Sequence, residues 1–165
     1  MKLEISLMPR GSWGKSLAQL LDFKVWGELR REVYKRFNHS CGICGVSNKV
    51  LHCHEVWEFQ EKKKLQVLRG FIAICEDCHS IIHFGFTLKE IEKGKKTRSE
   101  LKRLVDHFCK VNGVTEDVFN KHQREAFETY RRQSEIKFII VWGKFSPVNV
   151  TKVYTKMLKD KERKK

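Results

Sequence analysis

The chain has 165 residues, 41% of them hydrophobic and 33% charged, and a formal net charge of +14 at pH 7. This balance excludes a disordered chain and favours one globular domain with its own core. So high a positive charge favours a polyanionic partner, nucleic acid first, and no stretch approaches the roughly 18 apolar residues of a membrane span.

The N-terminal residues, MKLEISLMPRGSWGK, contain an acidic side chain and no continuous apolar core. They therefore do not form a secretory signal, and the protein is expected in the cytoplasm under reducing conditions. Cysteines in that compartment are more often metal ligands or unpaired core thiols than disulfides.

Hydrophobic spacing predicts a mixture of helices and strands along the chain. Helical spacing occurs first, as one helix or as two with Gly27 as the candidate break, and strand-like runs follow. Later helices are separated by Asn112-Gly113, and the C-terminal end, residues 155–165, is expected to fray. The predicted helices are 16–37, a short one ending at Gly85, 99–111 and 115–135; the apolar or strand-like runs are 50–59, 68–75 and 136–142.

Four cysteines form two C-x2-C pairs, Cys41 with Cys44 in CGIC and Cys75 with Cys78 in CEDC. Two such pairs suit a tetrahedral thiolate site for Zn²⁺. Four thiolates complete the coordination, so this zinc would be structural and would contribute to folding. The other two cysteines, Cys53 and Cys109, fit no pair and are interpreted as core thiols.

Histidines are concentrated around these cysteines. In VLHCHEVWEF, alternation along a strand places His52 and His54 on one face and Glu55 on the other. After the last cysteine, His79 and His83 share one face of a helix. These imidazoles could pack in the core, or they could surround a second metal ion with a position left open for substrate.

Such a group matches the needs of phosphodiester hydrolysis. A base must take a proton from water, and histidine does so near neutral pH without a large pKa shift. A divalent cation must stabilise the charge that develops on the phosphate and the leaving oxygen.

The segments CGIC, LHCHEVW and ICEDCHSIIH together resemble the HNH endonuclease family, whose fold is the zinc-braced ββα-metal (His-Me) finger. The resemblance covers roughly residues 41–85 and implies a bacterial or phage protein that cuts DNA with one Mg²⁺ or Mn²⁺ ion. It implies that His54 is the general base, that His79 belongs to the catalytic site and that His83 is a metal ligand.

The chain departs from the family pattern at two positions. Cys53 stands where the family usually has a metal-binding aspartate or histidine, and Gly70 stands where an asparagine is usual. Glu55 or His52 is the expected substitute as the missing ligand, because a carboxylate or an imidazole can hold such an ion.

Basic side chains beside this region are the expected DNA contacts. One group lies in the turn between the two pocket strands, and the other follows the histidine-bearing helix. These residues are Lys62, Lys63, Lys64, Lys95, Lys96 and Arg98. A helix-turn-helix formed by the pair of helices around Asn112-Gly113 is an alternative DNA-binding element.

The sequence thus predicts an α+β fold with an N-terminal helical arm (1–40), a zinc-supported ββα-metal core (41–86), a C-terminal helical extension (87–150) and a basic tail (151–165). The predicted function is a metal-dependent DNA endonuclease. A non-catalytic zinc-finger DNA-binding protein and a basic protein that binds an acidic protein partner are the alternatives. A homodimer would explain double-strand breaks, although no sequence feature requires one.

Overall fold

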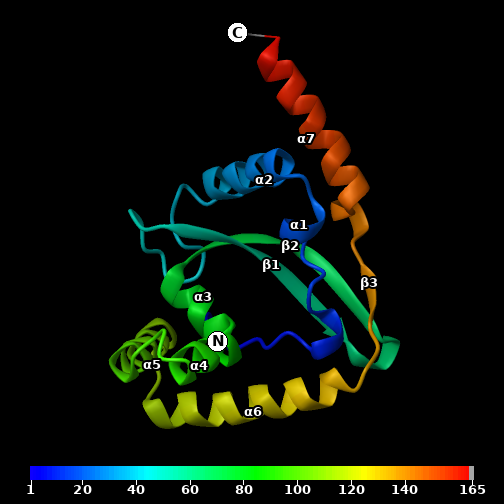
Figure 1. Cartoon of the computed structure of the whole chain (residues 1–165). Helices are drawn as coiled ribbons and strands as arrows, with labels where there is room; N and C mark the ends of the chain where they lie inside the picture. The colour runs from blue at the N-terminus through cyan, green and yellow to red at the C-terminus, as the bar shows by residue number, and fades with distance from the viewer. Residues whose placement is uncertain (164–165) are drawn as a thin grey trace.

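The computed structural model describes residues 1–163, and these residues form an α+β fold with seven α-helices and a three-stranded sheet (Figure 1). The helices are α1 (Leu17–Leu20), α2 (Phe23–Arg36), α3 (Glu76–Ile82), α4 (Phe84–Glu92), α5 (Arg98–Asn112), α6 (Glu116–Ser134) and α7 (Pro147–Glu162). The strands are β1 (Leu51–Gln60), β2 (Leu65–Cys75) and β3 (Ile139–Val141).

The sheet is dominated by a long hairpin of β1 and β2, followed directly by α3. The two strands pair antiparallel from Leu51 opposite Cys75 to Gln60 opposite Leu65, and β3 adds parallel to the first residues of β2. The strand order β1-β2-β3 leaves β1 at an edge. Hydrophobic alternation and β-branched residues explain the strands, and the chain reverses through a short 3-10 turn after Gln60.

An irregularity in the hairpin explains one unusual residue of the sequence. The register shifts between Val56 and Trp57, opposite the segment that contains Gly70. The φ angle of Gly70 is +155°, a conformation that residues with a Cβ rarely adopt. An asparagine at this position would be strained, so the local backbone favours glycine here.

Helices cover both faces of the hairpin. α2 lies on one face, and α3 lies on the other together with α4, α5 and α6 (Figure 1). On the α2 side, Trp26 packs edge-on against Phe71 with ring centroids 6.5 Å apart. Beyond α3, Phe108 and Phe119 pack with ring centroids 5.0 Å apart and belong to the same core as the N-terminal residues Leu3 and Ile5.

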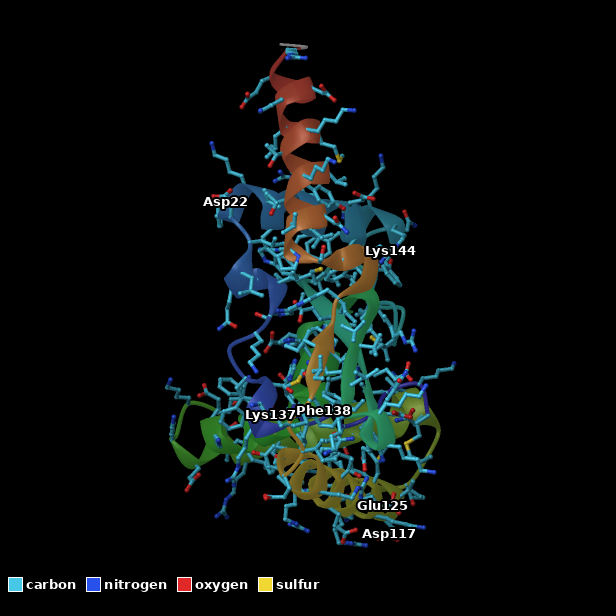
Figure 2. The ribbon with its side chains drawn as sticks, turned by 90° about the vertical axis from the view of Figure 1, so that its right-hand side faces the viewer. Asp22, Asp117, Glu125, Lys137, Phe138 and Lys144 are labelled. Atoms are coloured by element: carbon cyan, nitrogen blue, oxygen red, sulfur yellow. The ribbon has the colours of Figure 1, made fainter. Side chains whose placement is uncertain are left out.

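The C-terminal helix α7 projects from one end of the molecule, and α6 lies at the opposite end (Figures 1 and 2). The first half of α7 is anchored, because Val150 and Tyr154 are buried and the Tyr154 hydroxyl donates to Glu32 at 2.6 Å. The expectation that residues from 155 onward fray is wrong for the residues up to Glu162, which are helical; residues 164–165 lie outside the described residues.

Two predicted helix ends are also wrong. Gly27 lies inside α2, and the break comes earlier, where the Asp22 side chain accepts from the Lys24 amide at 2.9 Å and begins the helix. Gly85 lies inside α4, and the preceding helix ends at Ile82. None of the helices within residues 1–163 has the length and apolar character needed to cross a membrane.

Candidate functional site

The four paired cysteines converge between the hairpin and the loop that precedes it. Their sulfur atoms all lie within 4.8 Å of one another, and the Sγ atoms of Cys44 and Cys75 are 3.7 Å apart. Four sulfurs at the typical Zn–S distance of about 2.3 Å lie about 3.8 Å from one another in a tetrahedron. The cluster therefore has the donors and the spacing to bind a structural metal such as zinc.

Local backbone geometry explains how the first pair is held. The Gly45 amide donates to the Cys41 carbonyl at 2.9 Å, and Gly45 has a φ of +77°, which favours glycine. Gly42 is required for a different reason: a Cβ there would lie 2.6 Å from the Phe37 ring and 2.8 Å from Ile72. The CGIC turn is thus packed tightly against β2.

A histidine that the sequence analysis did not single out contacts this cluster. His107 on α5 lies with Nε2 3.3 Å from the Cys78 sulfur. On the same helix, Arg103 donates to Asp77 at 2.5 Å. The Nζ atom of Lys49, which lies in the loop before β1, is 3.6 Å from that carboxylate. α5 therefore contacts the four-cysteine cluster from outside. Local spacing in the sequence could not reveal this contact, because 29 residues separate Cys78 from His107.

The thiols of this group also change one another's acidity. Contacts with Cys75 and Cys78 lower the pKa of Cys41, whereas the contact with Cys41 raises the pKa of Cys75 to about 11. One thiolate is thus favoured within the group. Thiolates are the form in which cysteine binds a metal ion.

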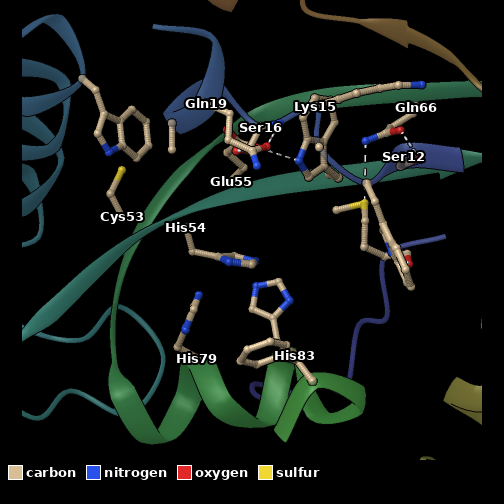
Figure 3. A pocket seen from close by; sticks show the side chains of 17 residues that line it. Ser12, Lys15, Ser16, Gln19, Cys53, His54, Glu55, Gln66, His79 and His83 are labelled. Atoms are coloured by element: carbon tan, nitrogen blue, oxygen red, sulfur yellow. Dashed lines mark hydrogen bonds between the residues drawn. The ribbon is translucent and has the colours of Figure 1, made fainter. Parts of the chain in front are cut away.

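Three predicted histidines form a second group. Ligand nitrogens of His54, His79 and His83 lie within 4.8 Å of one another. The ring of His54 is centred 5.7 Å from that of His79 and 5.0 Å from that of His83, and the latter two are 4.6 Å apart. Figure 3 shows His54 reaching from β1 toward the two rings on the helical side.

His52 joins this region through a separate contact. Its ring stacks on His79 at 4.4 Å with an interplanar angle of 3°, and its Nε2 lies 2.6 Å from the Glu76 carboxylate. His52, Glu76 and His79 form another group whose ligand atoms lie within 4.8 Å of one another. His79 belongs to both groups, so it is the central side chain of the site.

Regular geometry produces these contacts. Alternate residues of β1 face α3, so His52 and His54 point the same way. His79 and His83 are four residues apart and meet one turn along α3, with His83 at the junction to α4. The four imidazoles thus lie in two overlapping groups, both of which contain His79.

Burial determines the charge state of the histidines. Desolvation, followed by the proximity of the other imidazoles, lowers the pKa of His54 to about 3 and that of His79 to about 4, and burial also lowers the pKa of His83. These rings are neutral at pH 7 and can bind a metal or accept a proton. His54, the expected base, therefore has a strongly lowered pKa in the free protein, and a nearby anionic phosphate would raise it.

The two residues beside His54 lie on the opposite face of β1 (Figure 3). Glu55 accepts from the Leu17 amide at 2.6 Å and from Trp57 Nε1 at 2.9 Å, and burial raises its pKa. It belongs to neither histidine group. The structure instead uses Glu55 to hold the start of α1, so His52 with Glu76, and not Glu55, lies where an additional ligand was expected.

A cavity of about 630 Å³ opens beside His54, His79 and His83. The N-terminal segment 8–19 forms its opposite wall. The residues of this segment that line it are Met8, Ser12, Trp13, Gly14, Lys15, Ser16, Ala18 and Gln19. The histidine group thus has access to a space large enough for a substrate group.

The predicted DNA-binding lysines lie in two different places. Lys62, Lys63 and Lys64 occupy the hairpin turn; a rise of about 3.3 Å per residue puts this turn roughly 20 Å or more along β1 from His54, so it is not beside the histidines. Lys96 is close, with Nζ 3.8 Å from Glu76, whereas Lys95 pairs with Glu90 at 3.8 Å and Arg98 begins α5.

No protein-family model, no curated protein and no solved structure matches the chain. The interpretation of the site therefore depends on the residues and the geometry described above.

Proposed function

We propose that the chain is a metal-dependent endonuclease of the HNH type, which hydrolyses phosphodiester bonds in DNA. The observation that supports this proposal most directly is the convergence of His54, His79 and His83 from a hairpin and the helix that follows it. These histidines adjoin a cavity, and the four-cysteine cluster lies at the base of the same hairpin and helix. This arrangement agrees with the ββα-metal unit expected from the sequence resemblance.

Each histidine has a role in the proposed reaction. His54 accepts the proton of the attacking water through its neutral ring. His79 would hold a divalent cation together with His83, or together with His52 and Glu76. When bound, the cation would stabilise the charge on the phosphate and the leaving oxygen.

The donor atoms restrict the choice of cation. Held by His79 and His83, the cation would meet only imidazole nitrogen from the chain, which suits Zn²⁺, Ni²⁺ or Fe²⁺ better than Mg²⁺. The group with Glu76 adds a carboxylate oxygen, the ligand type that Mn²⁺ and Mg²⁺ favour. Mn²⁺, which accepts both donor types, is the ion that we propose first.

The charges around the site are consistent with DNA as the substrate. The chain carries a net charge of +14, Lys15 lines the cavity and Lys96 lies beside Glu76. Lysines beside a reactive site bind phosphates and make affinity fall as salt rises.

The test is incubation of the purified protein with supercoiled plasmid and a single added cation, Mg²⁺, Mn²⁺, Ni²⁺ or Zn²⁺. We expect nicking with Mn²⁺ that EDTA abolishes and added Mn²⁺ restores. Circular dichroism after EDTA treatment shows whether loss of activity comes from loss of the structural metal. Binding without cleavage under every cation would support the non-catalytic DNA-binding alternative instead.

A further inference from the structure

An aromatic groove leads away from the histidine group. The 630 Å³ cavity and a neighbouring cavity of about 290 Å³ share four lining residues, Met8, Trp13, His83 and Phe86. The second cavity continues to Phe127 on α6, which also lines a third cavity together with Arg124 and Arg131. A continuous surface thus runs from the proposed cleavage site to α6.

Two large rings in this groove are exposed although neither contributes to the core. Trp13 is 53% exposed and Phe86 is 64% exposed. Single exposed aromatic residues are common, but here both line the same two cavities beside the histidines. Flat aromatic surfaces of this kind are the usual platforms for unpaired bases.

The segment that presents Trp13 is held in place before any ligand arrives. The Trp13 indole donates to the Met8 carbonyl at 2.9 Å, and Ser12 donates to the buried Gln66 side chain at 2.6 Å. Arg10 connects the segment to α6 through Tyr130 at 3.4 Å. Because these contacts order the indole in advance, stacking on it would cost little conformational entropy.

The charges along the groove favour an anion over an apolar protein partner. Lys89 lies with Nζ 5.2 Å from the centre of the Trp13 ring, and Lys15 lines the larger cavity. Among the described residues that line the first two cavities, Glu55 is the one carboxylate, and it already accepts two hydrogen bonds. Phosphates could therefore approach without facing a free negative charge.

We propose that this groove binds an unpaired DNA strand, with bases stacked on Trp13 and Phe86 and phosphates near Lys89 and Lys15. The inference rests on the proposed nuclease function and adds the substrate class: DNA with a single-stranded segment, such as a flap, a gap or a melted site. Cleavage then occurs where that strand passes His54, and duplex DNA binds through sequence-independent phosphate contacts alone.

Fluorescence anisotropy of the full-length protein with a labelled oligo(dT) strand and with a matched duplex tests this proposal, without added divalent cations. Trp13→Ala and Phe86→Ala should each weaken single-strand binding about 5- to 150-fold, the range expected for one stacked base. Duplex binding should change less than twofold. Phe23→Ala is the matched control, because Phe23 is an aromatic residue that is 84% exposed and lines neither cavity.

Further measurements make the result decisive. Circular dichroism checks that Trp13→Ala is folded, and Trp13→Phe should retain most of the single-strand affinity because phenylalanine also stacks. An oligo(rU) strand shows whether the groove accepts RNA equally. Unchanged single-strand binding in both alanine variants, or an equal loss for strand and duplex, overturns the proposal.

The outcomes separate this inference from the nuclease function. If wild type nicks plasmid but Trp13→Ala binds the single strand as well as wild type does, the groove proposal is wrong and the nuclease proposal stands. Binding of oligo(dT) that depends on Trp13, in a protein that never nicks, removes the nuclease and keeps the groove. Wild type that binds neither strand nor duplex overturns both.

Discussion

The four-cysteine cluster and the histidine group both adjoin the β1–β2 hairpin and α3, yet their surroundings differ. Three of the four thiols, those of Cys41, Cys75 and Cys78, are no more than 3% exposed, and Cys44 is partly buried. The histidines, by contrast, are only partly buried, and His54, His79 and His83 line an open cavity. A closed set of four sulfurs suits a structural ion, whereas an accessible set of imidazoles suits an ion that must also meet a substrate. The two groups therefore differ both in ligand type and in access to a cavity.

The largest expected effect comes from a substitution in the four-cysteine cluster. Cys75→Ser should remove the structural metal and leave the chain largely unfolded, because such metal binding contributes more than the whole net stability of a small domain, on the order of 5 kcal/mol or more. Elemental analysis should find one zinc per wild-type chain, and circular dichroism should show the loss of structure in the variant. Cys109→Ser is the control, since Cys109 belongs to no ligand group. A folded, metal-free Cys75→Ser protein would contradict a structural role.

A substitution in the histidine group should instead reduce activity and leave the fold intact. His54→Ala should reduce plasmid nicking about 100- to 10,000-fold, the usual contribution of a general base, while the protein stays folded and still binds DNA. Gel assays of nicking rate and thermal melting measure the two effects. His39→Asn is the control, because His39 is an exposed histidine with a φ of +53° that asparagine tolerates. Equal nicking by both variants would exclude His54 as the base.

His107 lies outside the four-cysteine cluster but contacts one of its sulfur atoms. His107→Ala should weaken zinc binding about 10- to 100-fold, the range typical of residues that contact a metal ligand, because the Cys78 sulfur loses its neighbour at 3.3 Å. Competition with a chromophoric chelator measures the affinity. Lys102→Ala on the same helix is the control, since Lys102 pairs with Asp106 away from the cysteines. Identical zinc affinity in both variants would show that the contact is incidental.

The smallest predicted effect is a pH dependence of stability. His54 and His79 have pKa values of about 3 and about 4 in the folded chain, below the ordinary 6.5. Between pH 6.5 and pH 4 the unfolded chain therefore binds more protons, so stability falls as the pH is lowered, by up to about 2 kcal/mol for each histidine between pH 7 and pH 5. Thermal melting without added divalent cations should show this slope, and His54→Ala should flatten it. The same slope in both proteins would place the acid sensitivity elsewhere.

Local patterns predicted much of the fold correctly. Alternation in 50–59 and the apolar run 68–75 correspond to β1 and β2, and Asn112-Gly113 separates α5 from α6 as expected. Helix ends were less well predicted: Gly27 and Gly85 lie inside helices, because tertiary packing outweighs the modest cost of a helical glycine. The C-terminal helix was missed since its stabilising contacts, Tyr154 with Glu32 among them, join distant parts of the chain.

The sequence by itself determined which side chains could meet. C-x2-C spacing sets each pair of thiols, strand alternation sets His52 with His54, and the four-residue helical repeat sets His79 above His83. Only the tertiary structure decided that Glu55 accepts from the Leu17 amide, that His107 contacts a cysteine and that Trp13 lines the cavity beside the histidines. The physical reason is range: backbone periodicity orients neighbours within a turn or a strand, whereas packing between elements depends on the shapes of surfaces far apart in the chain.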